Sequence, residues 1–143
     1  MKKFMVLVLA FFVLNSLSYA SESNIKIVVK GIKKKTGIMF ISLNNSKEDY
    51  EKFKNKEPYK GIKKPVEDIL LTDYFKDVPY GEYAIRIFHD VNSNGKLDAN
   101  FLGVPEEPYG FSNNAKGFIG PPTFKYAKFI IDTANVTVTI NLN

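Results

Sequence analysis

The chain has 143 residues, a formal net charge of +5, no cysteine and a single histidine. That length is typical of one domain, and a composition of 45% hydrophobic and 24% charged residues is typical of a globular protein. Disulfide scaffolds, cysteine-ligated metals, thiol nucleophiles and two-histidine metal helices are excluded, because the residues that they require are missing from the sequence.

Residues 1–20 have the pattern of a secretory signal peptide. Two lysines precede an apolar run from Phe4 to Leu14, which is too short to span the ~30 Å hydrocarbon core of a bilayer. Ser18 and Ala20 are small residues at the positions that a signal peptidase reads. We therefore expect cleavage after Ala20 and export of residues 21–143 to the periplasm or the outside of the cell, with no transmembrane segment in the mature chain.

Most of the mature chain shows the period-two alternation of β-strands, as in Ile25, Ile27 and Val29. One short helical turn is expected after Ser46, with Asp49 at the reciprocal position of a capping box. The predicted strands are residues 24–30, 37–43, 67–75, 82–89, 125–131 and 136–142, the last two joined as a hairpin by residues 132–135. This pattern predicts an all-β fold, a single antiparallel β-sandwich over residues 21–143.

Residues 90–124 form one long stretch with little strand character. A loop of this length in a compact domain is usually either functional or disordered. Its aromatic side chains argue against disorder; they are Phe101, Tyr109, Phe111, Phe118 and Phe124. We expect a long ordered loop that packs on itself.

The long loop begins with the spacing D-x-N-x-N-G-x-x-D, which is typical of a calcium-binding loop. Oxygens at alternate positions of a tight turn can supply the six to eight ligands that calcium prefers. The expected ligands are Asp90, Asn92, Asn94, the carbonyl group of Lys96, and Asp98. Phe101 stands where an EF-hand has its bidentate Glu, so the loop is not an EF-hand. A turn without an ion, held by its own side-chain hydrogen bonds, is the alternative interpretation.

His89, Asp90 and Glu106 are candidates for acid–base chemistry in an envelope hydrolase or sugar-processing enzyme. This alternative requires the three side chains to converge on one pocket. No nucleophile motif such as G-x-S-x-G accompanies them in the sequence. A structural histidine that donates a hydrogen bond to a loop carbonyl is therefore the favoured interpretation of His89.

Tyr109, Phe111, Asn113 and Asn114 form the candidate binding surface. Aromatic rings beside Asn amides are typical of a surface that binds sugars. The same composition also suits a loop that covers one end of a sandwich, and this is the interpretation that we favour from the sequence.

The stretch from Phe88 to Ala115 carries a family resemblance. A signal peptide, a strand ending in F-H-D-x-N-x-N-G-K-L-D, then N-F-L-G-x-P-x-E-x-Y-G-F-S-N-N-A and G-P-P-x-F resemble the bacterial secreted domain-of-unknown-function family 2141. Val91 departs from the pattern, since the family usually has an acidic residue there. The resemblance implies an exported protein with an immunoglobulin-like or transthyretin-like sandwich, and it assigns no activity. Residues 77–83 also resemble a hairpin of surface-adhesin repeats, some of which bind calcium.

These patterns predict an exported, non-enzymatic binding or interaction module of the cell envelope. We expect calcium bound at residues 90–98 to stabilise its fold. The expected partner is an envelope protein or a glycan. Nucleic acid is not expected, because the chain has an export signal, a single arginine and no nucleic-acid-binding motif. A purely structural interaction domain, marked by a flat apolar patch, is a further alternative.

Overall fold

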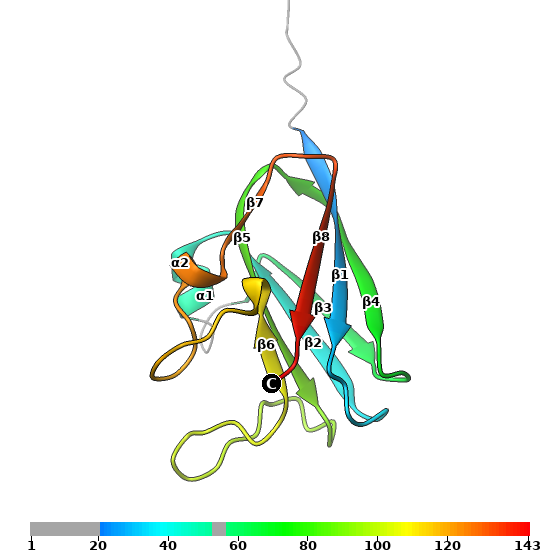
Figure 1. Ribbon diagram of the computed structural model, residues 1–143, viewed down its shortest axis with the longest axis vertical. Helices are drawn as coiled ribbons and strands as arrows, with labels where there is room; N and C mark the ends of the chain where they lie inside the picture. Colours follow the sequence, from blue (N-terminus) through cyan, green and yellow to red (C-terminus); the bar gives the residue numbers. More distant parts are fainter. Residues whose placement is uncertain (1–20, 53–56) are drawn as a thin grey trace, which may run out of the picture.

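The computed structural model describes residues 21–52 and 57–143, so the predicted signal peptide lies outside the described residues. Long strands make up most of the molecule, and two short helices lie together on one side of it (Figure 1). The elements in chain order are β1 (Glu22–Lys30), β2 (Ile38–Asn44), α1 (Lys47–Glu51), β3 (Lys60–Pro65), β4 (Leu71–Pro79), β5 (Gly81–Asp90), β6 (Tyr109–Phe111), the 3₁₀ turn η1 (Ser112–Asn114), α2 (Phe124–Ala127), β7 (Phe129–Ile131) and β8 (Asn135–Asn141).

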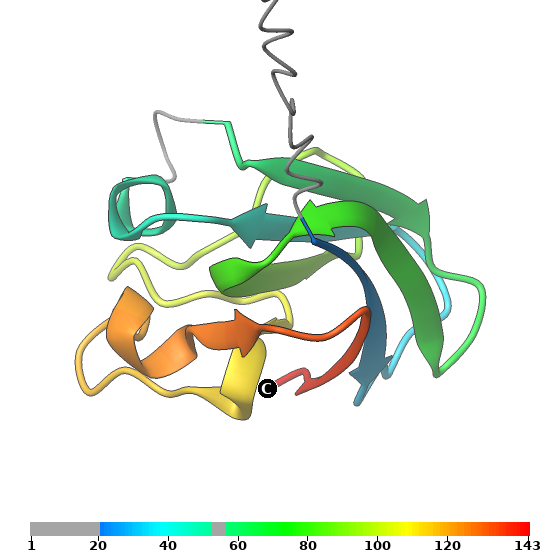
Figure 2. The ribbon, with the colours of Figure 1, turned by 90° about the horizontal axis from the view of Figure 1, so that it is seen from above.

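The strands form two sheets that pack face to face, as the view from above shows (Figure 2). The smaller sheet has the order β4-β1-β8, and the larger has the order β3-β2-β5-β6, with β7 paired to the beginning of β5. Neighbouring strands are antiparallel except β1 and β8, which run parallel from the pair Asn24–Asn135 to the pair Lys30–Asn141. The prediction of an all-β sandwich is confirmed.

The main core lies between the sheets, where alternate residues of each strand point inward. Ile25, Ile27 and Val29 of β1 are fully buried, as their alternation predicts. They belong to one apolar cluster with residues of the facing sheet such as Ile41 and Ile87. Burying each such side chain contributes roughly 1.5–3 kcal/mol to folding. The two sheets therefore form a well-packed scaffold from which the loops extend.

A second, smaller cluster holds the two helices. The Ser46 hydroxyl accepts a hydrogen bond from the Asp49 amide at 3.1 Å, which confirms the predicted start of α1. Tyr50 of α1 packs edge-on against Phe124 of α2 and Phe111 of β6, with ring centroids 5.8 and 6.5 Å apart. Aromatic contacts of this kind join the helices to β6.

The structure has two strands in the region where we predicted one over residues 67–75. The chain forms β3 at Lys60–Pro65 and then β4 at Leu71–Pro79. The sequence does not reveal β3, because Ile62 is its only large apolar residue. An edge strand with little surface to bury does not need the alternating pattern.

The predicted strand over residues 125–131 and the hairpin after it are also corrected. The chain forms α2 first, and only Phe129–Ile131 are extended. Phe124 and Ala127 are both buried in the second cluster, and their spacing of three residues favours a helical turn. Residues 132–134 form no hairpin, because β7 pairs with β5 in the larger sheet and β8 pairs with β1 in the smaller one.

One open side of the sandwich, the β6–β8 side, is closed by neutral groups. The Asn143 amide donates to the Tyr109 carbonyl at 2.9 Å. The backbone and side-chain amides of Asn141 both donate to Asn114 Oδ1, at 2.8 and 3.2 Å. Gly110 allows this approach, since a Cβ atom there would lie 2.7 Å from the Ile140 side chain.

The opposite open side, the β3–β4 side, is closed by lysine side chains. Lys60 Nζ donates to the carbonyl oxygens of Lys76 and Asp77 at 2.6 and 3.1 Å. Lys64 Nζ donates to the Thr72 carbonyl at 3.1 Å and lies 2.9 Å from the Asp73 carboxylate. The lysines of β3 thus donate hydrogen bonds to backbone carbonyl groups of β4.

Candidate functional site

The stretch predicted as a long ordered loop is anchored to the larger sheet at its middle. Tyr109–Phe111 form β6, which pairs with β5 through Phe88 and Arg86. Ser112 then fixes the chain, because its buried hydroxyl accepts from the Ile85 amide at 2.9 Å and donates to the Ala127 carbonyl at 2.5 Å. The loop is therefore ordered, and a short part of it joins the sheet.

Asp90 organises the loop that follows β5. Its side chain is fully buried, and its two carboxylate oxygens accept hydrogen bonds from the Asn94 and Gly95 amides at 3.1 and 2.7 Å. Gly95 has a φ of +82°, a left-handed conformation that suits glycine at this turn. The carboxylate therefore holds the turn by bonding its backbone.

Asp98 closes the same loop from the other end. Its carboxylate accepts from the Asn92 side-chain amide at 2.6 Å and from the Asn94 side-chain amide at 2.9 Å. These two amides, together with the nearby Lys96, hold the pKa of Asp98 below its usual value. The side-chain oxygen of Asn92 accepts from the backbone amide of Asn94, and that of Asn94 accepts from the backbone amide of Lys96.

Glu107 completes the loop, a role that the sequence analysis assigned to no residue. The buried Glu107 carboxylate accepts from the Val91 amide at 2.8 Å and from the Asp98 amide at 3.0 Å. It thereby ties the start and the end of the predicted calcium loop to the strand that returns toward β6. Two adjacent glutamates before a strand are the only sequence signal for this role.

The structure brings the five predicted calcium ligands into one loop, but it turns their groups toward one another. Asp90 and Asp98 accept hydrogen bonds from loop amides, and the amide nitrogens of Asn92 and Asn94 face Asp98. Across residues 21–52 and 57–143, no three His, Asp or Glu side chains gather in a way that could hold a metal ion. This geometry corresponds to the self-bonded turn that the sequence left as the alternative.

The three residues of the hydrolase alternative do not share a pocket. His89 and Asp90 are consecutive strand residues and point to opposite faces of the sheet, and both are fully buried. A ring nitrogen of His89 lies 2.6 Å from the Thr36 carbonyl, as the structural interpretation expects. Glu106 is exposed, outside this buried pair. The convergence that acid–base chemistry requires is therefore not present at these residues.

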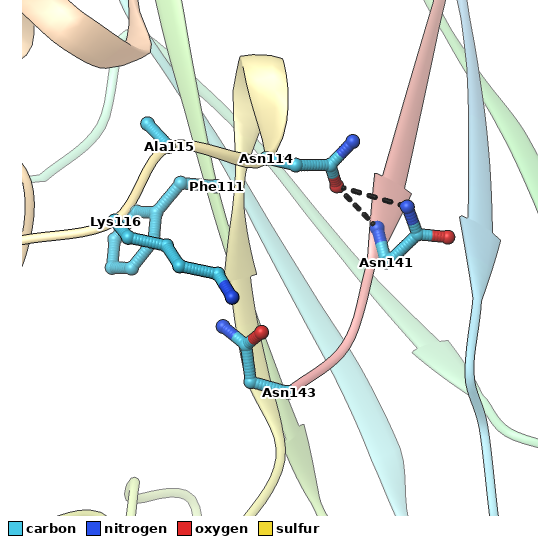
Figure 3. A pocket seen from close by; sticks show the side chains of 6 residues that line it. All are labelled: Phe111, Asn114, Ala115, Lys116, Asn141 and Asn143. Atoms are coloured by element: carbon cyan, nitrogen blue, oxygen red, sulfur yellow. Dashed lines mark hydrogen bonds between the residues drawn. The ribbon is translucent and has the colours of Figure 1, made fainter.

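Three of the four predicted binding residues line two adjoining hollows beside β6. One hollow, of about 160 Å³, is lined by Phe111, Asn114, Ala115, Lys116, Asn141 and Asn143. The other, of about 320 Å³, is lined by Tyr109, Phe111, Ala115, Lys116, Gly117, Gly120, Pro122 and Asn143. Figure 3 shows the Lys116 side chain crossing the view of the Phe111 ring and extending toward Asn143. We call this region the β6 hollow.

Asn113 has a different place from its neighbour. Its side-chain amide donates to the carbonyl groups of Tyr126 and Lys128 at 3.2 and 2.8 Å, so it holds the end of α2. Asn113 and Asn114 have φ values of 60° and 49°, in the left-handed region that Asn tolerates better than most residues. Their conformation directs one amide to α2 and the other to β8.

Lys116, Asn141 and Asn143 belong to the β6 hollow, although sequence analysis did not select them. Lys116 supplies a flexible ammonium group, and Asn143 supplies an amide at the rim. Asn141 and Asn143 reach this position because β8 ends beside β6. Only the packing of the two sheets brings them there.

The single arginine stands behind the β6 hollow. Arg86 pairs with Phe111 across β5 and β6, and its guanidinium lies 4.9 Å from the centre of the Tyr50 ring. Burial lowers the pKa of Arg86 to about 10, and burial raises the pKa of Tyr50 above its ordinary range. The Arg86 cation over the Tyr50 ring stabilises the position of Tyr50, which in turn packs against Phe111.

Comparisons with known proteins give one result. Residues 27–139 match the model of a family described as "Uncharacterized protein conserved in bacteria (DUF2141)". No curated protein and no solved structure matches the chain. Within the described ranges, no helix is long and apolar enough to cross a bilayer.

Proposed function

The chain belongs to the bacterial family DUF2141, which is uncharacterised, and we propose that it is an exported, non-enzymatic binding module of the cell envelope. The observation that carries the proposal is the β6 hollow, where Tyr109, Phe111 and Asn114 of the predicted binding surface meet Lys116 and Asn143. A concave site with aromatic walls and a few polar groups is typical of ligand binding.

The chemistry of the hollow favours a glycan with an acidic group. The Asn143 amide offers both a donor and an acceptor, as sugar hydroxyl groups require. The Lys116 ammonium can pair with a carboxylate or phosphate on the sugar. Phe111 provides an apolar part of the wall of the hollow. The open shape of the hollow suits the end of a chain rather than an enclosed small molecule.

The state of the buried titratable groups supports a role without catalysis. His89 and Asp90 are both held by backbone groups and have no access to solvent. Catalytic acids and bases must instead come within hydrogen-bond distance of a substrate. The polar side chains at the β6 hollow carry amides and an ammonium, which suit binding.

Binding to envelope oligosaccharides tests the proposal. The purified protein should bind acidic oligosaccharides more tightly than neutral ones, and Lys116→Met should weaken the acidic binding more than about tenfold. Lys125→Met is the matched control, since Lys125 is exposed on α2 and does not line the hollow. If the protein bound no glycan but was cross-linked in cells to one envelope protein through the β6 hollow, the partner would be a protein instead.

Export has a direct readout. Protein recovered from cells that express the full chain should begin at Ser21, because the predicted peptidase site follows Ala20. If the recovered protein still began at Met1, the proposed cleavage would be contradicted.

Calcium at residues 90–98 stays a prediction, in which the ion would replace the bonds from Asn92 and Asn94 to Asp98. Calcium at a hundredfold excess over its Kd would stabilise the fold by about 2.7 kcal/mol. The melting temperature would then be higher in calcium than in chelator, and Asp90→Ala would abolish the difference. Equal melting temperatures would leave the self-bonded turn as the explanation.

A further inference from the structure

Two loop tips expose apolar side chains almost completely. In the Phe101 tip, Phe101 and Leu102 are 95% and 72% exposed. In the Phe118 tip, Phe118 and Ile119 are 102% and 90% exposed. Exposed apolar groups that lie together on a soluble protein mark sites of contact with a partner or a membrane.

The base of the Phe101 tip is closed by hydrogen bonds. Asn100 Oδ1 accepts from the Leu102 and Val104 amides at 2.9 and 3.1 Å, and the Asn100 amide donates to the Val104 carbonyl at 2.9 Å. Below it, the Glu106 amide donates to the Asp98 carbonyl at 2.8 Å. The turn therefore holds Phe101 and Leu102 outward.

The Phe118 tip is closed by glycine backbones. A Cβ atom on Gly117 would lie 2.0 Å from the Gly120 carbonyl oxygen, so the two glycines pack directly against each other. Gly120 has a φ of +80°, which other residues rarely adopt. This tight closure leaves Phe118 and Ile119 at the outer end of the turn.

Both tips project from the same side of the molecule. In Figures 1 and 2 the loop before β6 and the loop between η1 and α2 both extend to the left. The loop between β3 and β4 extends to the right in both views, and it carries two other exposed apolar residues, Ile69 and Leu70. The two tips thus lie on one side of the molecule, and the apolar loop between β3 and β4 lies on the opposite side.

The shape of the tips favours a lipid bilayer over a folded protein. The four exposed side chains belong to two separate turns, so a rigid partner would need a separate depression for each tip. A fluid bilayer surface accommodates such projections. Lys96 and Lys116 are exposed on the same two loops, which also carry the carboxylates of Glu106 and Asp98. Lysines at this position can reach anionic headgroups.

We propose that the Phe101 tip and the Phe118 tip insert together into the interfacial region of a lipid bilayer. Phe101, Leu102, Phe118 and Ile119 enter the boundary between headgroups and acyl chains, as the apolar faces of peripheral proteins do. Lys96 and Lys116 then lie at the level of the headgroups. This inference rests on the two tips and on the lysines of the same loops, and it does not require that the β6 hollow bind a glycan.

Sedimentation with lipid vesicles tests the proposal. The purified protein should bind vesicles of phosphatidylcholine, and adding phosphatidylglycerol should strengthen the binding. The variants Phe101→Ser/Leu102→Ser and Phe118→Ser/Ile119→Ser should each weaken it more than about tenfold, because each loses two inserted apolar side chains. Ile69→Ser/Leu70→Ser is the matched control and should bind as the wild type does.

Two further measurements make the outcome decisive. The melting temperature of each tip variant should equal that of the wild type, since the replaced side chains are almost fully exposed. The tip variants also keep every side chain that lines the β6 hollow, so retained glycan binding would separate this proposal from the previous one. The proposal is overturned if the wild type binds no vesicle, if the tip variants bind normally, or if sedimentation velocity shows a dimer that the tip variants lose.

Discussion

The β6–β8 side and the β3–β4 side both close the gap between the two sheets, but with different groups. On the β6–β8 side, backbone and Asn amides meet neutral acceptors, and Gly110 lets the strands approach closely. On the β3–β4 side, Lys60 and Lys64 extend across the gap on long side chains. The first closure depends on shape and the second on charge, so they should respond differently to mutation, salt and pH.

The largest expected effect comes from filling the close approach at Gly110. Gly110→Ala places a Cβ atom 2.7 Å from Ile140 and 3.0 Å from the Asn141 carbonyl, and should cost about 1–3 kcal/mol of stability. Gly61→Ala on β3 is the matched control, because its nearest neighbour would lie at an ordinary 3.5 Å. Urea unfolding measures both variants, and equal costs would refute the difference between the two sides.

A smaller effect is expected from Asn114→Gly. This variant keeps the left-handed backbone but removes the oxygen that accepts from both Asn141 amides, which should cost about 1 kcal/mol. Ser93→Gly provides the control, since Ser93 also has a positive φ, of 60°, in the loop after β5. A cost no larger than that of Ser93→Gly would mean that water replaces the Asn114 oxygen without loss.

On the charged side, Lys60→Met should cost about 0.5 kcal/mol, because Lys60 is an exposed donor on a flexible stem. Most of this cost should disappear in ~1 M salt, where charges are screened within about 3 Å. The cost of Asn114→Gly should not change with salt. Unfolding curves at low and high salt give the comparison, and an equal salt response of both variants would contradict it.

The smallest effect concerns acid. Burial acts to raise the pKa of Asp73, but hydrogen bonds from Lys64 and the Tyr74 amide and the charge of Lys64 outweigh it, so the pKa lies below its usual value. A lowered pKa stabilises the fold above the unfolded pKa, and this is lost as the pH falls through the folded pKa. Asp73→Asn should therefore cost less than ~0.5 kcal/mol at neutral pH and nothing at pH ~2. If Asp73→Asn were still less stable than the wild type in acid, the cost would come from packing and not from the charge of Asp73.

Sequence patterns predicted the strands that bury one full face. Ile25, Ile27 and Val29 alternate because they face the other sheet, and this requirement is visible without a structure. β3 escaped prediction because an edge strand needs no such face. α2 was taken for a strand because burial of Phe124 and Ala127 depends on Tyr50, which comes from a distant part of the chain.

The sequence also revealed the site residues that lie close together along the chain and missed those that only the fold brings together. The turn around Asp90 is local in sequence, so its members could be named from their spacing. Glu107 could not, because its bond to the Val91 amide joins residues sixteen positions apart. Asn143 enters the β6 hollow only through the pairing of β8 with β1, which places the end of β8 beside β6.

The parallel pairing of β1 with β8 has a mechanical consequence. The chain enters the pair at the start of β1 and leaves it at the end of β8, which lie at opposite ends of the ladder between Asn24–Asn135 and Lys30–Asn141. Tension applied through the two flanking segments therefore shears the ladder and loads its evenly spaced hydrogen bonds simultaneously, instead of peeling them apart one at a time. Stretching along the strands therefore has to break several of these hydrogen bonds at once.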